Sequence, residues 1–328
     1  MAEIMHLSEA EAHALGVESL TRIGLTSDEA SVTTDHLVDN MLCGYHFAGL
    51  PRILAMAATD DIKRPRRPVS IMKETPLSAI VDGGNHAGYI AVRRGAEVAI
   101  EKARTGGGLA VVGVANTWFS GRNAYYLELI ARAGLVGIHT VGGSHMVVPP
   151  GAKKAALGTN PFAAAFPCDP DPFMFDMGTG ATTWGEVLLR SYTGESFPEG
   201  IGVDRDGNPT TNASDMAEGG VLAFGGYKGF GLSLTIQALA LLAGSSLKRD
   251  QVLDFGPFFI VIDPDLLIGR DKFRRELRQM LDEIKNLPRQ DGVDEIRLPS
   301  ERAFEERARR KVEGVILERP VYDRLRQL

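Results

Sequence analysis

Hydrophobic residues in the first 45 positions recur at helical spacing, and two helix-start motifs precede them. Ser8-x-x-Glu11 and Thr26-x-x-Glu29 have the residue types of capping boxes, in which a hydroxyl and a carboxylate satisfy free backbone amides. The second helix is expected to stop at Gly44, because glycine commonly follows the last turn of a helix. This part of the chain is therefore predicted to be helical.

The pattern changes after the basic, proline-bearing stretch 63–69. Short runs rich in β-branched residues follow at 77–81, 109–114 and 136–141, which is typical of strands. Between the first two runs, residues 88–104 repeat Ala, Val and Ile at helical spacing. Strand, helix and strand in this order predict an α/β domain whose sheet is covered by helices.

The C-terminal part returns to a helical pattern. One apolar stripe consists of Phe273, Leu277, Met280, Leu281 and Ile284. A further helix is expected from about Ser300 to Gly314. Before these helices, residues 182–212 are rich in turn formers. Within that segment, 204–210 is expected to be a hairpin turn, since its glycine comes too early for a calcium loop.

Composition and charge narrow the class of protein. The 328 residues are 44% hydrophobic and 24% charged, which is ordinary for a globular protein of two or three domains. The formal net charge is −6 and the pI is near 5.7. Affinity for nucleic acid comes from concentrated Lys and Arg, so no nucleic-acid partner is expected.

No segment predicts a membrane or secretory destination. The first residues lack a basic region followed by an apolar core, and the apolar helix expected at 230–243 is too short to cross a bilayer. Two cysteines, Cys43 and Cys168, cannot make a disulfide framework or a multi-thiolate metal site. We therefore expect a soluble, cytoplasmic protein with no metal and no membrane partner.

Glycine-bearing stretches are the strongest functional signal. The Rossmann pattern G-x-G-x-x-G and the phosphate-loop pattern G-x-x-x-x-G-K-[ST] are both missing from the sequence. Three others stand out: L-G-T-N-P-F at 157–162, F-D-M-G-T-G-A-T at 175–182 and F-G-G-Y-K-G-F-G-L at 224–232. Glycine lets a ligand approach the backbone, and Lys228 with the amides of the following helix start can hold a phosphate group. Each stretch alone fits an ordinary turn, but together they favour a nucleotide site.

The order and spacing of four motifs resemble those of a known family. The motifs are Gly158-Thr159-Asn160-Pro161, Asp176-Met177-x-Thr179, Gly225-Gly226-x-Lys228-Gly229 and Leu298-Pro299-x-Glu301. Through these motifs the chain resembles, over nearly its whole length, the malate/L-lactate dehydrogenases of the non-Rossmann type. That family includes ureidoglycolate and sulfolactate dehydrogenases, diketogulonate reductase and reductases of piperideine-2-carboxylate.

The resemblance implies an α/β fold with a non-Rossmann nicotinamide-binding domain, built on a mixed sheet, and a separate helical domain. We expect the cofactor domain at 76–269 and the helical, dimerisation domain at 1–75 plus 270–328. The resemblance also implies a homodimer that binds NAD or NADP and a small-molecule substrate. By this resemblance, Ser144 is expected to bind the substrate. The residues expected to contact the cofactor are Thr159, Asn160, Asp176, Met177, Gly178, Thr179, Tyr227, Lys228, Pro299, Ser300 and Glu301.

The chain departs from the family at its proton donors. Family members carry G-x-x-S-H-G-x-x-R, with the His as donor and the Arg on the substrate carboxylate. The matching stretch here is G-Y-H-F-A-G-L-P-R at 44–52, so Phe47 and Ala48 replace Ser and His while Arg52 survives. A second family His, in N-S-x-H-x-G, is replaced by Phe119. A positioned acid contributes about 10²- to 10⁴-fold in rate, so these losses bear directly on the reaction.

Three functions remain open from the sequence. In the first, the substrate is a 2-imino acid of pyrroline or piperideine type that enters already protonated, is held by Arg52 and lies against Phe119. In the second, the substrate is a 2-oxo acid and His46 or His145 supplies the proton; Asp176 is the third catalytic candidate. In the third, the protein binds NAD(P) without conventional dehydrogenase turnover, or uses NAD in a reaction with no net redox change.

Overall fold

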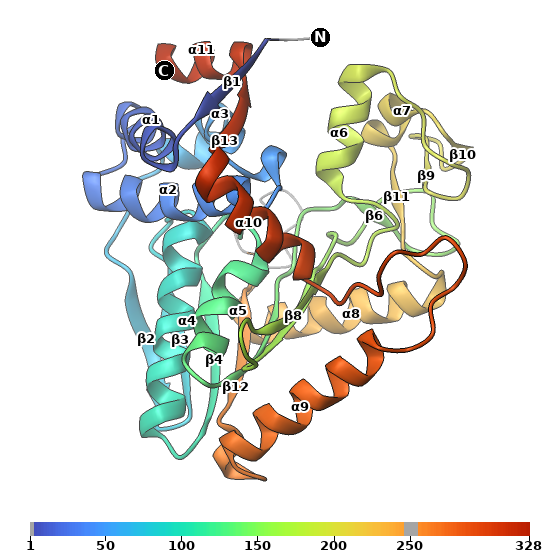
Figure 1. The fold of residues 1–328 in the computed structure, drawn as a ribbon. Helices are drawn as coiled ribbons and strands as arrows, with labels where there is room; N and C mark the ends of the chain where they lie inside the picture. The colour runs from blue at the N-terminus through green and yellow to red at the C-terminus, as the bar shows by residue number, and fades with distance from the viewer. Residues whose placement is uncertain (1–2, 246–254) are drawn as a thin grey trace.

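The computed structural model describes residues 3–245 and 255–328. A seven-stranded mixed sheet forms its body, with a helical unit at one end and a small second sheet to the side (Figure 1). Both chain ends lie at the helical end (Figure 1). The predicted α/β fold with a mixed sheet and an added helical part is thereby confirmed.

The large sheet has the strand order β2-β3-β4-β12-β5-β7-β8. Its strands are β2 (Ser70–Thr75), β3 (Ser78–Asp82), β4 (Leu109–Ala115), β12 (Phe258–Ile262), β5 (Val136–Thr140), β7 (Phe162–Phe166) and β8 (Phe173–Met177). The predicted strands correspond to β3, β4 and β5. β3 and β4 pair in parallel, whereas β12 runs antiparallel to both β4 and β5. That antiparallel insertion separates this sheet from the parallel Rossmann sheet.

Helices cover both faces of the large sheet. They are α4 (Gly88–Thr105), α5 (Asn123–Arg132) and α8 (Tyr227–Leu242). Alternate residues of a strand point to opposite faces. On β4, Val114 meets α4, because a Cβ on Gly95 would lie 2.5 Å from it. Gly113 points the other way, toward Ala243 just after α8, where an added Cβ would lie at 2.9 Å. Among residues 3–245 and 255–328, none of the helices has the length and apolar character that a bilayer span requires.

The helical unit is built from both ends of the chain. Its elements are β1 (Ile4–Leu7), α1 (Glu9–Arg22), α2 (Ser27–Leu42), η1 (His46–Ala48), α3 (Pro51–Ala58), η2 (Asp60–Lys63), α10 (Glu301–Glu313), β13 (Val315–Glu318) and α11 (Arg319–Gln327). Both predicted capping boxes form, at Ser8 with Glu11 and at Thr26 with Glu29. β1 pairs antiparallel with β13, which joins the two ends. Gly44 follows α2 with φ +84°, as expected.

A second, four-stranded sheet lies to the side of the body. Its elements are β6 (Val147–Val148), α6 (Trp184–Thr193), β9 (Gly202–Val203), β10 (Pro209–Thr210), α7 (Ala213–Glu218) and β11 (Gly220–Leu222). The hairpin turn predicted at 204–210 is confirmed, with Asp204 Oδ1 accepting the amide of Asn208 at 2.9 Å. Helix α6 was not apparent in this turn-rich segment. It is stabilised by Thr183 at its N-cap and by burial of Val187 against the small sheet.

Helix α9 (Arg270–Lys285) lies apart from the other C-terminal elements, below α8 in Figure 1, and follows the short η3 (Pro264–Leu266). Its residues Leu277 and Leu281 are buried against Phe166 and Phe173 of β7 and β8. By contrast, α10 contacts α2, and α11 contacts α1 and α3. Residues 70–75 form the edge strand β2 of the large sheet. The division at 75/76 and 269/270 remains a prediction.

Candidate active site

The three glycine-bearing stretches meet at one end of the large sheet. Thr159 O accepts hydrogen bonds from Thr179 N at 2.7 Å and from Thr179 Oγ1 at 2.9 Å. Phe224 N donates to Thr179 O at 3.0 Å. Asn160 Nδ2 donates to Ser233 O of α8 at 3.0 Å. Stretches that are distant in the chain therefore lie side by side, as a shared site requires.

The fourth motif contacts the edge strand β8 from the C-terminal segment. Ser300 Oγ donates to the carbonyl of Met174 in β8 at 3.0 Å. Ser300 adopts φ +69° directly before α10. Glu301 accepts from Leu298 N at 2.9 Å and pairs with Lys285 Nζ at 2.6 Å. Pro299, between these residues, is exposed.

The predicted cofactor residues divide into buried and exposed groups. Asn160 is fully buried, and its Oδ1 has no hydrogen-bond donor in the described part of the chain. Tyr227 is 76% exposed, and Lys228 beside it is exposed as well. Gly225 and Gly226 precede them with φ of +55° and +61°, so the backbone there turns without a Cβ in the way. The start of α8 is thus open to a ligand.

Asp176 anchors the start of α5. Its Oδ2 accepts the backbone amide of Ala124 at 2.9 Å, which satisfies one of the amides left free at a helix N-terminus. Burial raises the pKa of the Asp176 carboxyl, and the Ala124 amide and Arg122 offset part of that rise. The residue keeps some exposed area, but the carboxyl itself faces α5. Met177 and Gly178, which follow, are partly buried.

Arg52 and Phe119 form a stacked pair. The guanidinium carbon of Arg52, on α3, lies 4.6 Å from the ring centroid of Phe119. Trp118 lies next to this ring, with centroids 5.1 Å apart. Arg52 is partly buried, yet its side chain makes no ion pair or hydrogen bond within residues 3–245 and 255–328. A half-buried cation without a carboxylate is a candidate anion binder.

The segment η1, which contains Ala48, is anchored to α2 by a hydrogen bond. Asn40 Nδ2 donates to the carbonyl of Ala48 at 2.9 Å, and Arg122 Nε donates to Asn40 Oδ1 at 2.8 Å. The His46 ring nitrogen Nε2 lies 3.5 Å from the guanidinium of Arg310 on α10. Burial and Arg310 lower the pKa of His46. His46 therefore faces a cation instead of a proton acceptor.

Asn40 and Arg122 belong to a buried polar network that the sequence did not predict. Arg122 pairs with Asp39. Arg307 of α10 reaches the same carboxylate at 3.0 Å and Glu128 at 2.6 Å. The sequence holds a weak signal, since Asn40 is a polar residue among the buried positions of α2. Its partner Arg122 is 82 residues away, so the pairing is not visible without the fold.

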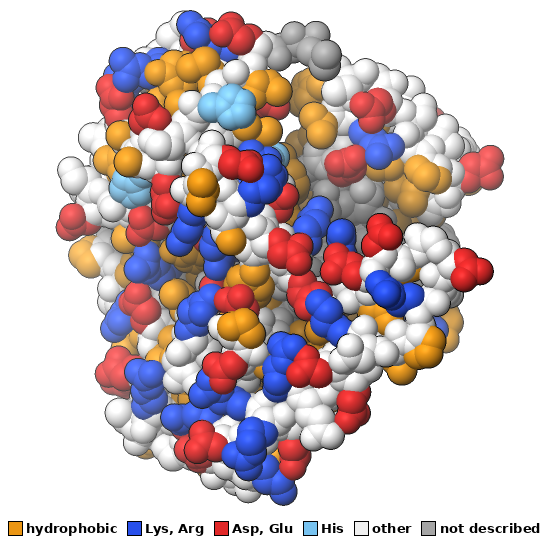
Figure 2. Space-filling view, in the orientation of Figure 1, with side chains coloured by type: hydrophobic (Ala, Val, Ile, Leu, Met, Phe, Trp, Pro, Cys, Tyr) orange, Lys and Arg blue, Asp and Glu red, His pale blue; other side chains and the backbone are white. Residues whose placement is uncertain are grey.

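The remaining substrate and catalytic candidates are more exposed. His145 is exposed on the loop between β5 and β6, and Ser144 before it is partly buried. Phe47 is 49% exposed, and its ring touches α6, where a Cβ on Gly185 would lie 2.9 Å from it. Figure 2 shows the surface hollowed between the α6 side and the α10 side of the molecule. Phe47 thus joins the helical unit to the small-sheet unit.

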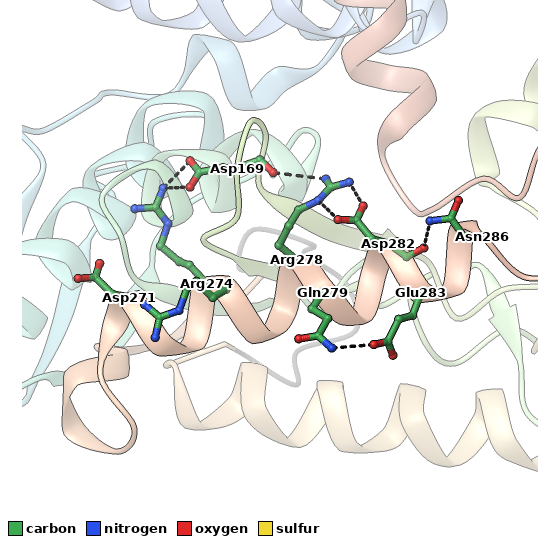
Figure 3. Close-up of a pocket in the computed structure, with 9 residues that line it drawn as sticks. Asp169, Asp271, Arg274, Arg278, Gln279, Asp282, Glu283 and Asn286 are labelled. Atoms are coloured by element: carbon green, nitrogen blue, oxygen red, sulfur yellow. Dashed lines mark hydrogen bonds and ion pairs between the residues drawn. The ribbon is translucent and has the colours of Figure 1, made fainter.

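A separate hollow of about 700 Å³ runs along α9 and contains none of the predicted site residues. Most of its polar residues are paired, as Figure 3 shows, whereas Asp271 and Arg275 make no ion pair or side-chain hydrogen bond within residues 3–245 and 255–328. Arg274 pairs with Asp169, and Arg278 pairs with Asp282. Gln279 Nε2 donates to the Glu283 carboxylate at 2.8 Å. Within the described residues, the one cation of this hollow without a partner is Arg275, which is exposed, whereas Arg52 is partly buried.

Comparison with known proteins agrees with this geometry. A family model described as malate/L-lactate dehydrogenase matches residues 7–326. The L-sulfolactate dehydrogenase of Methanocaldococcus jannaschii is 32% identical over 95% of this chain and 93% of its own length. A pyrroline-2-carboxylate/piperideine-2-carboxylate reductase of Pseudomonas putida is 34% identical over 76% of this chain and 74% of its own. The crystal structure of a piperideine-2-carboxylate reductase from Pseudomonas syringae superposes with a TM-score of 0.87 at 27% identity, covering 98% of this chain and 99% of that one.

These similarities, with the fold and the converging loops, define the class of protein: an NAD(P)-dependent oxidoreductase without a Rossmann sheet. The chain belongs to the malate/L-lactate dehydrogenase family. Its relatives include dehydrogenases of sulfolactate and ureidoglycolate and reductases of cyclic imino acids.

Proposed function

We propose that this protein is an NAD(P)H-dependent reductase of a small cyclic 2-imino acid, of pyrroline- or piperideine-2-carboxylate type. The bound nicotinamide supplies the hydride. Arg52 holds the substrate carboxylate, and the apolar surface of Phe119 and Phe47 lines the site. The small-molecule partner and the reductase chemistry follow the family, whereas the choice of an imine rests on this chain's own residues.

The proposal rests on one contrast: the site has a cation that can bind a carboxylate, but it lacks the two histidine acids of the family. Arg52 is a partly buried cation with no ion pair or side-chain hydrogen bond within residues 3–245 and 255–328, while Ala48 and Phe119 stand where the family has proton donors. A ketone needs a proton as hydride arrives, because an alkoxide forms. A protonated imine becomes a neutral amine when it takes hydride, so orientation and a carboxylate clamp suffice. The residues present suit the second case.

The histidines nearest in sequence are poor substitutes for the lost acids. A general acid at neutral pH must hold its proton until the reaction. The pKa of His46 is lowered by burial and Arg310, so its ring is mainly neutral at pH 7. His46 is also directed at Arg310, a cation that cannot accept a proton. His145 is exposed on its loop, and no contact holds its ring toward the site within the described residues. This disfavours the 2-oxo acid alternative with either histidine as acid.

The residues present fit a nicotinamide nucleotide. The open N-terminus of α8, behind Gly225 and Gly226, presents backbone amides and Lys228, which suits a phosphate group. Asn160 Oδ1 is a buried acceptor without a donor among the described residues, which suits the carboxamide of a nicotinamide ring. We propose that Tyr227, Lys228, the 176–179 segment and the 299–301 segment contact the cofactor. Neither NAD nor NADP is favoured by these residues.

A matched substrate panel tests the proposal. Purified protein is assayed with NADH and with NADPH against pyrroline-2-carboxylate, piperideine-2-carboxylate and open-chain 2-oxo acids of the same carbon number, following nicotinamide absorbance. We expect the cyclic imino acids to be reduced at least about 10²-fold faster than the oxo acids, the lower end of what a general acid contributes. Faster turnover of an oxo acid would contradict the proposal. Cofactor binding with no turnover of any substrate would support the alternative, a divergent family member that lacks conventional dehydrogenase turnover.

A further inference from the structure

The contact between Arg52 and Phe119 is more specific than it would need to be if Phe119 only filled the space of a missing histidine. The guanidinium lies over the face of the ring, at 4.6 Å from its centroid, where the negative face of the aromatic system attracts a cation. This is its one close electrostatic contact in the described chain, since Arg52 has no ion pair or side-chain hydrogen bond there. The ring is therefore the one aromatic or polar partner of the guanidinium among the described residues.

The backbone of Phe119 is strained to present the ring. Phe119 adopts φ +50°, a left-handed conformation that bulky residues rarely occupy and that costs on the order of one to a few kcal/mol. The conformation is held from outside, because Gly88 N donates to Phe119 O at 2.7 Å. A Cβ on Gly88 would lie 2.1 Å from that oxygen, so the contact requires glycine. Strain that the surroundings hold in place is typical of functional sites.

The position of the guanidinium over the ring leaves its N–H groups available to a ligand. It has no carboxylate partner in the described chain, so a bound carboxylate can accept two parallel hydrogen bonds from it. Loss of the ring would let the long Arg52 side chain sample other rotamers, and fixing it again would weaken binding. If Phe119 only filled space, its replacement would affect the binding of charged and uncharged ligands alike.

We propose that Phe119 is a positioning residue, which stacks on Arg52 and orients the guanidinium so that the site selects small planar 2-carboxylates. The residue that stands where the family has an acid would then contribute to carboxylate recognition through Arg52. The inference rests on the proposed function in one respect, the assignment of the substrate carboxylate to Arg52. It does not require turnover.

The test measures binding of two unreactive, planar ligands that differ in charge. Pyrrole-2-carboxylate and pyrrole-2-carboxamide are titrated calorimetrically into wild type, Phe119→Leu and Phe119→Tyr, each with and without NADH. In Phe119→Leu we expect the dissociation constant of the carboxylate to rise about 3- to 10-fold, as for loss of a cation–π contact, and that of the carboxamide to change less than about 2-fold. Phe119→Tyr, which keeps the ring, should retain the wild-type affinity for the carboxylate.

Each other outcome overturns the inference. Equal weakening of both ligands in Phe119→Leu would show that the ring only lines the pocket, and unchanged binding of both would show that it does not position Arg52. If wild type does not prefer the carboxylate, or the neutral variant Arg52→Gln leaves that preference intact, Arg52 is not the clamp. Failure of the proposed function looks different: the carboxylate preference and its dependence on Phe119 would persist while cyclic imino acids are not reduced. Thermal unfolding of each variant verifies that it is folded.

Discussion

At the scale of single residues, we propose that this site has apolar and cationic contacts in place of proton donors. By resemblance to the family motifs, we infer that Ala48 and Phe119 stand at two histidine positions and Arg52 at that of the carboxylate binder. The structure adds what each replacement does: Phe119 stacks on Arg52, and Phe47 reaches Gly185 of α6. The carbonyl of Ala48 is held by Asn40, so the backbone that would carry the histidine remains in place.

The double variant Phe47→Ser with Ala48→His distinguishes an imine site from a disabled oxo-acid site. Protonation is not part of hydride transfer to an iminium, so the rate on the cyclic imino acid should not rise. A fully positioned acid contributes about 10²- to 10⁴-fold to the rate. The rate on a matched 2-oxo acid should rise by less than this. Steady-state kinetics on both substrates measures this, with Phe47→Ser alone as the control for the lost contact to α6. A gain that makes the oxo acid the better substrate would contradict an imine site.

Lys228→Ala should weaken binding of NADH and NADPH. The change removes an exposed cation beside the open start of α8, where we place a phosphate group. An exposed charge-assisted contact supports an increase in dissociation constant of about 3- to 10-fold. Calorimetric titration measures it. Lys272→Ala, which removes an exposed lysine on α9, is the matched control and should bind as wild type does. Unchanged affinity in Lys228→Ala would place the phosphate elsewhere.

At the scale of elements, the start of α5 depends on a residue from β8. The N-cap of α5, Arg122, gives no capping bond from its side chain, and Asp176 accepts the Ala124 amide instead. This contact fixes the start of α5 against the end of β8. A residue that the sequence marks as catalytic is thus also an anchor of the active-site scaffold.

Asp176→Asn should flatten the pH dependence of stability. The pKa of Asp176 is raised from an ordinary value of about 3.8, so the folded state holds this proton more tightly than the unfolded state does. The resulting stability is complete below the ordinary value and is lost as pH rises through the raised one. A difference of one pKa unit corresponds to about 1.4 kcal/mol. Urea unfolding from about pH 4 to pH 7 measures the slope. Asp60→Asn, at a highly exposed carboxyl, should keep the wild-type profile. An unchanged profile in Asp176→Asn would contradict the assignment.

At the scale of the whole molecule, α9 leaves apolar surface uncovered. Its inner residues Leu277 and Leu281 pack within the chain, but Met280 is 46% exposed and Ile284 37%. Leu287, just beyond the helix, is 56% exposed. Clustered exposed apolar side chains of this kind mark protein interfaces. A second copy of the chain is the occupant that we predict, as the family resemblance implies.

Light scattering should therefore give the mass of a dimer at micromolar concentration. Met280→Lys with Ile284→Lys introduces charge into the proposed interface and should raise the dimer dissociation constant by at least about 10-fold, since a buried unpaired charge is costly. Val312→Lys is the control, because Val312 is 89% exposed on α10 and apart from this surface. A monomeric wild type would refute the dimer. A dimer unaffected by the α9 change would place its interface elsewhere.

Local pattern in the sequence was enough to predict the elements that depend on short-range physics. Capping boxes act within one helical turn, which is why Ser8 and Thr26 predicted the starts of α1 and α2 correctly. β-Branched runs predicted β3, β4 and β5. The short strands β1 and β13 were not predicted, because each is stabilised by the other from the opposite end of the chain.

The sequence by itself determined the family, the absence of histidine at positions 48 and 119, and which stretches are candidates for the site. Motif order and residue identity are properties of the chain, so no fold is needed to see them. Only the tertiary structure decided how these residues act. It brought Phe119 beneath Arg52, turned His46 toward Arg310 and set Asp176 against α5. These contacts join segments far apart in the chain, and their geometry depends on packing that no local pattern encodes.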